Sequence, residues 1–342
     1  MKKSRMTLGL LVMLSCLLLR SVPATALSNP AETTDEISTM VQEHIDKAKI
    51  PSVSIGIVRN NEVTYLSFGE QYDSNALYQI GSTTKAFTAL AILWLDDEGV
   101  LSLDDPVNAY LPWFCMKYNG QEIPGSDITI ANLLYQTSGF TNDESKYPKA
   151  KPGMTLEAYI RTLAGCELSF YPSAQYAYAN ANYATLGLLI EVVTGKSYQD
   201  FMSTTIIKPL SLQNTYVDPE LAAIEGNVVP GSRLSFFQAH PYDVPVSTAS
   251  IPSGYIFSNA HDISRWLQIQ LGAIEVSPQM RRIIEKSHQP DENHFVNANT
   301  RYAAGWFVQD DGTIYHTGGT PNYSTKFFLR PDTGTAVCVL AN

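Results

Sequence analysis

Two side chains near residue 82 have the types and the spacing for nucleophilic chemistry. Ser82 and Lys85 stand three residues apart at the start of an apolar run that contains no Gly or Pro up to residue 95. This pattern predicts a buried helix that begins near Ser82 and carries both side chains on one face. If burial lowers its pKa, Lys85 can accept the serine proton; otherwise Ser82 is only a helix cap and Lys85 a solvated side chain.

A second polar pair precedes a predicted helix over residues 182–193. Tyr178 and Asn180 are two residues apart, so in an extended segment both side chains point the same way. A Tyr phenolate beside a cationic Lys is a credible base, and an Asn can donate to a substrate carbonyl. The alternative is a helix entry in which Asn180 serves as a cap.

A third motif, His316-Thr317-Gly318-Gly319, ends a predicted strand over residues 313–316. Two glycines after a Thr let a substrate approach the backbone, and an N–H group there can help to hold an oxyanion. The alternative is a simple strand-to-loop turn. His316 could be a polar strand residue, a charge near the substrate, or a rival general base.

The elements that position these motifs form two groups. Helix patterns cover residues 33–48, 182–193, 261–271 and 278–287, and strand patterns cover 52–58, 63–68, 303–308, 313–316, 326–330 and 335–340. We therefore expect an α/β (α+β) fold: an antiparallel sheet of about five strands, built from residues 33–85 and 290–342 and flanked by helices. A mostly helical insertion over about 86–289, with surface loops at 146–153 and 220–246, completes a single unit, and a site belongs at the junction.

The N-terminus indicates export. Basic residues, an uncharged run over residues 6–19 and an Ala-x-Ala site at 24–26 predict a signal peptide over residues 1–26, followed by a catalytic unit over 27–342. We expect an extracytoplasmic protein: secreted, periplasmic or on the outer face of the cell membrane. Without the four basic residues of the peptide, 19 basic residues face 33 acidic ones, which disfavours nucleic acid and anionic membranes as partners.

Other hydrolase classes lack their motifs in this chain. No Ser has Gly at both flanking positions of G-x-S-x-G, which an α/β-hydrolase would need. The six His residues are scattered and no H-E-x-x-H is present, so we expect neither a metal nor a cofactor. Three cysteines at irregular spacing in residues 27–342 do not suggest a disulfide framework.

Taken in order, S-x-x-K, Y-x-N and H-T-G resemble the signature motifs of the serine penicillin-recognising proteins. That family contains class C β-lactamases, low-molecular-weight DD-peptidases, and related D-aminopeptidases and esterases. The resemblance extends over residues 33–342 and includes the segments 132–139, 186–195 and 208–210. It implies an antiparallel sheet flanked by helices plus an all-helical domain.

The resemblance also implies the role of each site residue. Ser82 would be the acyl nucleophile, and Lys85 and Tyr178 would share the proton transfers. The remaining roles are substrate binding and an oxyanion hole made by two N–H groups: Asn180, His316, Thr317, Gly318, Gly319 and Asn322 would bind substrate, and Ser82 and Gly319 would form the hole.

Two features depart from the family pattern. His316 stands where β-lactamases and DD-peptidases usually have Lys, a form similar to that of D-aminopeptidases, esterases and membrane-anchored D-peptidases. The family's C-terminal helix does not follow Leu340 in this sequence, so we expect either a fragment or a sheet face that is covered in another way. A membrane anchor is expected only if the chain continues beyond Asn342.

The expected function is therefore an exported serine hydrolase that forms an acyl-enzyme on Ser82 and cuts D-amino-acid-containing peptides. Its substrates would be small peptides, peptidoglycan-like fragments, β-lactams or esters. The alternatives are a β-lactamase or esterase of the same family, and a non-catalytic penicillin-binding or cell-wall sensor protein.

Overall fold

The strands from the two ends of the chain pair into one antiparallel sheet. The computed structural model describes residues 30–69, 72–143, 145–235 and 238–342. Within these residues the main sheet has eight strands in the order β2-β1-β14-β13-β12-β11-β10-β9. The bounds are β1 Val53–Arg59, β2 Glu62–Phe68, β9 Phe295–Asn297, β10 Thr300–Tyr302, β11 Phe307–Gln309, β12 Ile314–Gly319, β13 Ser324–Arg330 and β14 Thr335–Ala341.

Helices cover both faces of this sheet. Helix α2 (Pro30–Ala48) buries Val41 and Ile45 against Val53, Ile55 and Val339 on one face. Helix α10 (Ala260–Gln270) lies on the other face, where a Cβ at Gly56 would come within 2.0 Å of the Ser264 hydroxyl oxygen. In β1 and β14, alternate residues face the two helix layers, which explains the near-continuous apolar runs of these strands.

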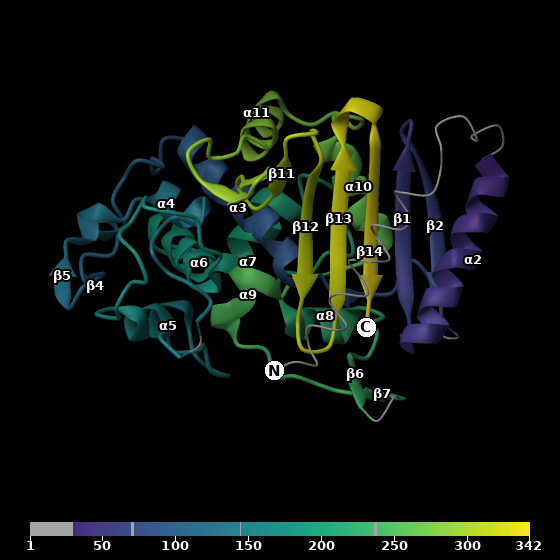
Figure 1. Cartoon of the computed structure of the whole chain (residues 1–342), viewed down its shortest axis with the longest axis horizontal. Helices are drawn as coiled ribbons and strands as arrows, with labels where there is room; N and C mark the ends of the chain where they lie inside the picture. The colour runs from purple at the N-terminus through teal and green to yellow at the C-terminus, as the bar shows by residue number, and fades with distance from the viewer. Residues whose placement is uncertain (1–29, 70–71, 144, 236–237) are drawn as a thin grey trace.

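The rest of the chain forms a mainly helical region beside the sheet, with β12 and α9 at the junction in Figure 1. Its helices are α3 Thr84–Asp97, α4 Ile130–Leu134, α5 Leu156–Leu163, α6 Asn180–Thr194, α7 Tyr198–Phe201, α8 Pro219–Glu225, α9 Ile251–Gly254 and α11 Pro278–Ser287. The short strand pairs are β3 (Tyr78–Gln79) with β8 (Phe257–Ser258), β4 (Met116–Tyr118) with β5 (Gln121–Ile123), and β6 (Ser232–Ser235) with β7 (Gln238–Pro241).

The sequence predicts the long strands well but undercounts the sheet. The additional members, β9, β10 and β11, are three residues long and therefore too short to show a clear alternation. The single strand predicted over 303–308 is wrong, because a turn at Ala303–Trp306 separates β10 from β11. Gly305 in that turn has a φ of +78°, and a Cβ there would come within 2.6 Å of the Ala86 Cα in α3.

The predicted surface loop over 220–246 also contains regular structure. Helix α8 and the β6–β7 hairpin both fall in this segment. Asp218 caps α8 through the N–H of Glu220, and Pro219 occupies the first helical position, so the local signals for a helix start were present.

The predicted signal peptide over residues 1–26 lies outside the described residues. Among those that are described, no helix combines the length and the apolar character needed to cross a lipid bilayer.

Candidate active site

Ser82 lies in a short 3₁₀ turn, Gly81–Thr83, that leads directly into α3. Gly81 has a φ of +54°, and a Cβ at this position would come within 2.5 Å of the Gly319 backbone nitrogen. Only glycine therefore permits both the backbone conformation and the close approach of this turn to β12. The turn holds Ser82 half-buried beside the end of β12.

Lys85 is fully buried in the first turn of α3, and its side-chain nitrogen contacts several groups of the site. Lys85 Nζ lies 3.2 Å from Ser82 Oγ, 2.8 Å from Asn180 Oδ1 and 2.6 Å from the carbonyl oxygen of Ser253. Burial lowers the pKa of Lys85 well below its usual value. A neutral amine donates two hydrogen bonds, so the two carbonyl acceptors leave its lone pair free to receive the Ser82 proton.

Tyr178 packs against Lys85, whose Nζ is 4.8 Å from the centre of the phenol ring. Burial raises the pKa of Tyr178, and the nearby Ser82 hydroxyl offsets only part of this rise. The Tyr178 hydroxyl is buried and makes no hydrogen bond of ordinary geometry among the described residues. The phenol form is therefore favoured, which makes Tyr178 better suited to donate a proton than to act as the phenolate base suggested by the sequence.

Asn180 begins α6 but does not cap it with its own side chain. The cap position is Ala179, and the backbone N–H of Asn180 instead donates to Asn142 Oδ1 at 2.9 Å. The Asn180 side chain is thus available to accept from Lys85, and the alternative of a purely capping residue is wrong. Sequence reasoning missed Asn142 and Ser253, since neither contact depends on a recognisable motif.

The third motif lies at an open edge of the sheet. On one side β12 pairs with β13 along its whole length, whereas on the other side β11 pairs only with Ile314 and Tyr315. The edge from His316 to Gly319 is therefore not covered by β11 and faces the turn that carries Ser82. Gly318 also requires close packing, because a Cβ there would come within 2.1 Å of the carbonyl oxygen of Ile80.

The positions of Ser82 and Gly319 suit an oxyanion hole. Their segments are in close contact, because a Cβ at Gly81 would come within 2.5 Å of the Gly319 nitrogen. The Ser82 nitrogen also lies close to α9, at 3.7 Å from the position that a Cβ on Gly254 would take. Two backbone N–H groups on rigid, adjacent segments can stabilise the charge of a tetrahedral intermediate without reorganisation. Half-buried Thr317 stands between His316 and these glycines on the same edge.

His316 is 1% exposed, and its ring lies among those of Tyr178, Tyr302 and Phe307. Its Nδ1 donates to the Thr317 carbonyl oxygen at 2.7 Å, and its Nε2 faces the Tyr302 hydroxyl at 3.3 Å. Burial is the main cause that lowers the pKa of His316, to about 3. The imidazole is thus neutral at ordinary pH, which does not support the hypothesis that a cationic His316 guides a substrate anion.

Asn322 lies in the turn between β12 and β13. Its side chain accepts from the Thr320 hydroxyl at 3.0 Å and donates to the Tyr242 carbonyl at 3.0 Å. Gly231 packs against it so closely that a Cβ would come within 2.1 Å of the amide nitrogen. These contacts hold the turn to the β6–β7 hairpin and do not join Asn322 to the residues around Ser82.

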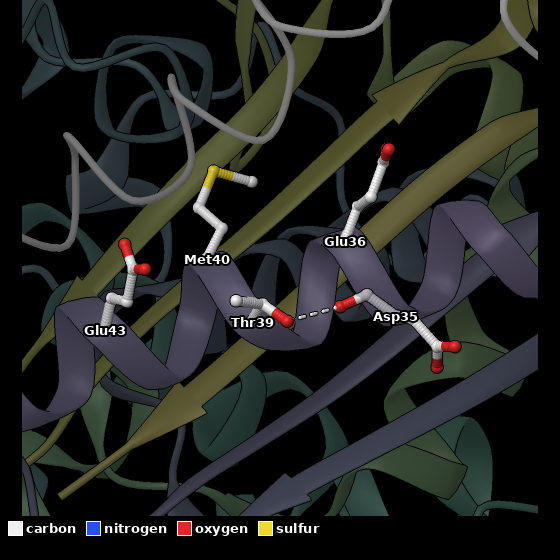
Figure 2. A pocket seen from close by; sticks show the side chains of 5 residues that line it. All are labelled: Asp35, Glu36, Thr39, Met40 and Glu43. Atoms are coloured by element: carbon white, nitrogen blue, oxygen red, sulfur yellow. Dashed lines mark hydrogen bonds between the residues drawn. The ribbon is translucent and has the colours of Figure 1, made fainter.

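A separate hollow of about 400 Å³ runs along α2, as Figure 2 shows. It is lined by Asp35, Glu36, Thr39, Met40 and Glu43, none of which belongs to the site around Ser82. Over the described ranges, no group of three or more His, Cys, Asp or Glu side chains could hold a metal ion.

Comparisons with known proteins agree with this arrangement. The family model described as "Beta-lactamase" matches residues 37–342. "Protein flp" of Staphylococcus aureus (strain MRSA252) is 31% identical over 91% of this chain and 63% of the relative. A "Putative D-alanyl-D-alanine carboxypeptidase" of Salmonella enteritidis PT4 (strain P125109) is 26% identical over 88% of this chain and 81% of the relative. The chain thus spans less than two thirds of the length of the first of these relatives.

Solved structures show the same fold. A class C β-lactamase superposes with a TM-score of 0.79 at 18% identity, covering 92% of this chain and 93% of its own. An octameric penicillin-binding protein homologue from Pyrococcus abyssi superposes with a TM-score of 0.75 at 23% identity. The match covers 90% of this chain and 73% of the homologue. With a matching family model over nearly the whole described chain and this fold, the protein belongs to the β-lactamase family of serine hydrolases.

Proposed function

We propose that this chain is an exported hydrolase that forms an acyl-enzyme on Ser82 and cuts amide bonds in peptides containing D-amino acids. The observation that carries the catalytic part is the position of Lys85. Its buried amine lies 3.2 Å from Ser82 Oγ while Asn180 and Ser253 occupy its two donor positions. A base with this geometry and a lowered pKa is available to activate the serine.

In the acylation step, Ser82 Oγ attacks the substrate carbonyl as Lys85 removes its proton. The N–H groups of Ser82 and Gly319 receive the oxyanion, and the resulting lysine ammonium has three acceptors around it. Tyr178, held as a phenol by burial, donates a proton to the leaving nitrogen as the C–N bond breaks. Lys85 then holds the proton taken from Ser82, and its release restores the Tyr178 phenol, so no net proton is gained or lost by the pair.

Water hydrolyses the acyl-enzyme and restores the Ser82 hydroxyl. Neutral His316 does not suit a role as base for that water, because its Nδ1 proton is bound to Thr317 and its Nε2 faces Tyr302. Lys85 and Tyr178 therefore also catalyse deacylation, with the proton transfers in the reverse order.

We propose peptides with D-amino acids as the substrate class because of the name of one relative and because of the third motif. The relative in Salmonella enteritidis is named a putative D-alanyl-D-alanine carboxypeptidase. A β-lactamase activity is the weaker candidate here, because neutral His316 offers no positive charge to the carboxylate of a β-lactam.

Labelling with a fluorescent fluorophosphonate, followed by a screen of matched D- and L-peptides, esters and nitrocefin, tests the proposal. We expect labelling of the wild type but not of Ser82→Ala, and cleavage that prefers a D-residue at the acyl position. Preference for the L-peptide would refute the assignment of substrate class. Export is tested by sequencing the mature N-terminus, which we expect to begin after residue 26.

A further inference from the structure

Aromatic side chains close one end of the open edge of β12. Phe307 stands where β11 leaves β12, and its half-buried ring is 5.0 Å from the His316 ring and 5.3 Å from the Tyr315 ring, centre to centre. The same ring stacks on Tyr178 at 6.5 Å with an interplanar angle of 18°. Tyr302 completes the group, 5.0 Å from Phe307. Tyr302 and His316 are each only 1% exposed. A substrate that follows the open edge of β12 therefore meets the half-buried Phe307 ring of this wall beside Tyr178, with the buried rings packed against it.

The cations near this wall are already engaged. Lys85 donates to Asn180 and to the Ser253 carbonyl. On β10, Arg301 lies 2.7 Å from Asp310 and 3.4 Å from Glu292, and its guanidinium covers the Phe295 ring at 4.3 Å. His316 points inward and is bonded through both ring nitrogens. On β13, Lys326 Nζ lies 5.5 Å from the centre of the Tyr315 ring, so this cation too is held by a neighbouring side chain. The ring contacts of Phe307 are with Tyr178, Tyr302, Tyr315 and His316, and none of these is a lysine or arginine.

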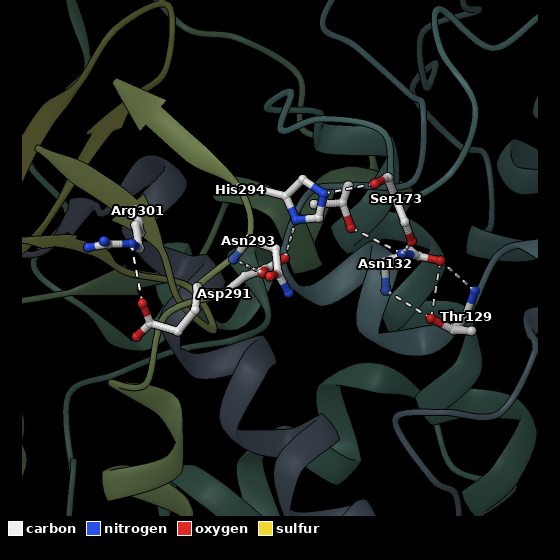
Figure 3. A network of polar contacts seen from close by, with 9 residues as sticks. Thr129, Asn132, Ser173, Asp291, Asn293, His294 and Arg301 are labelled. Carbon is white, nitrogen blue, oxygen red and sulfur yellow. Dashed lines mark hydrogen bonds and ion pairs between the residues drawn. The ribbon is translucent and has the colours of Figure 1, made fainter. Parts of the chain in front are cut away.

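A polar network, drawn in Figure 3, links the segment around Ser173 to the residues around Asp291. His294 bonds Asp291 through Nδ1 at 2.6 Å and the Ser173 carbonyl through Nε2 at 2.8 Å. Ser173 belongs to the segment that leads to Tyr178, and the N–H of Asp291 donates to the carbonyl of Tyr302. The distance between Tyr178 and the strands that carry Tyr302 and Phe307 is thus set by the fold.

Because Phe307 stacks on Tyr178, the role of Tyr178 indicates which part of a substrate lies beside Phe307. Tyr178 is the proton donor to the leaving group in the proposed mechanism, so the leaving group must sit on the Tyr178 side of Ser82. We propose that Phe307 forms a leaving-group subsite selective for neutral, apolar groups, so that the enzyme releases amides or longer peptides instead of free D-amino acids. This inference rests on the proposed function and deepens it.

In the proposed reaction each bond that forms is matched by one that breaks. The bond from Ser82 Oγ to the acyl carbon forms, the C–N bond breaks, and the leaving nitrogen takes one proton through Tyr178. Water then cleaves the ester, giving the acyl acid and the Ser82 hydroxyl. The released amine carries its apolar side chain against Phe307, whose contact with an apolar group is favourable whereas burial of an unpaired carboxylate beside it is costly.

Three peptides with the same acyl part test the subsite: N-acetyl-D-Ala-D-Phe amide, N-acetyl-D-Ala-D-Phe with a free carboxylate, and N-acetyl-D-Ala-D-Ala amide. We expect the wild type to cleave the D-Phe amide about tenfold or more better, in kcat/KM, than either other peptide. Phe307→Ala should reduce the ratio between D-Phe and D-Ala amides to near one, and Phe307→Lys should raise kcat/KM for the free carboxylate relative to the amide. Ratios are used because a general loss of activity or folding cancels from them.

Phe295→Ala is the matched control, since Phe295 is an exposed aromatic on β9 outside the group around Tyr178. It should leave all three ratios unchanged. Equal or better cleavage of the free carboxylate, or a D-Phe to D-Ala ratio that survives Phe307→Ala, overturns the subsite while leaving the acyl-enzyme intact. Failure of fluorophosphonate to label Ser82, with none of the peptides cleaved, overturns the proposed function and the subsite together.

Discussion

Acidification should destabilise this protein through the buried, neutral imidazole of His316. In the unfolded chain an imidazole has a pKa of about 6.5, whereas burial lowers that of folded His316 to about 3. Between these values the unfolded state binds more protons than the native state, so stability is present above pH 6.5 and is lost as the pH falls below it. At pH 5 the difference is about 1.5 pH units, which corresponds to about 2 kcal/mol.

Urea unfolding of wild type and His316→Gln at pH 7 and pH 5 measures this contribution. Gln can still donate to the Thr317 carbonyl but does not titrate, so the variant should lose about 2 kcal/mol less than wild type over this range. Other groups, including buried His288 with a pKa lowered to about 4, act in both proteins and cancel from the comparison. Equal losses in the two proteins would show that His316 is not buried and neutral in the way described.

Three further predictions concern the site. Tyr178→Phe should slow acylation by about 10²–10⁴-fold while leaving the urea midpoint unchanged or higher, since the lost hydroxyl makes no hydrogen bond; an unchanged single-turnover rate contradicts its role. For a neutral substrate, kcat/KM should rise with pH to a plateau as Lys85 loses its proton, at a pH well below the ordinary pKa of lysine, and a fall over that range contradicts a neutral base. Asn322→Ala should cost about 1–3 kcal/mol of stability, measured by urea unfolding, because it leaves the Tyr242 carbonyl without its donor; a loss seen only in KM would return Asn322 to substrate binding.

The sequence predicts the positions that local spacing controls. Ser82 and Lys85 are one turn apart, so the contact between them follows from helix geometry once the helix is recognised. The long strands β1, β13 and β14 likewise follow from apolar runs between turn residues. The pairing of Asn180 with Lys85 could be inferred only from the resemblance to a family, because 95 residues separate them.

Contacts made by backbone groups or set by tertiary packing were not predictable in this way. The carbonyl of Ser253 carries no side-chain signal, although it accepts the shortest hydrogen bond from Lys85. The neutral state of His316 depends on burial against Tyr302, and its position in a strand leaves either face possible until the register is known. The contacts of Asn322 were missed for the same reason, since its partners Tyr242 and Gly231 flank a hairpin that the sequence did not indicate; its expected part in substrate binding stays a prediction.

The acyl-enzyme on Ser82 is tested most directly by mass spectrometry of the trapped intermediate. The protein is mixed with an activated ester of N-acetyl-D-Ala, quenched in acid within the first turnovers, digested and mapped. We predict one acetyl-alanyl group on the peptide that contains Ser82, its disappearance as turnover completes, and no adduct in folded Ser82→Ala. An acyl group on another residue, or hydrolysis that continues at the wild-type rate in Ser82→Ala, would contradict the assignment of Ser82 as the nucleophile.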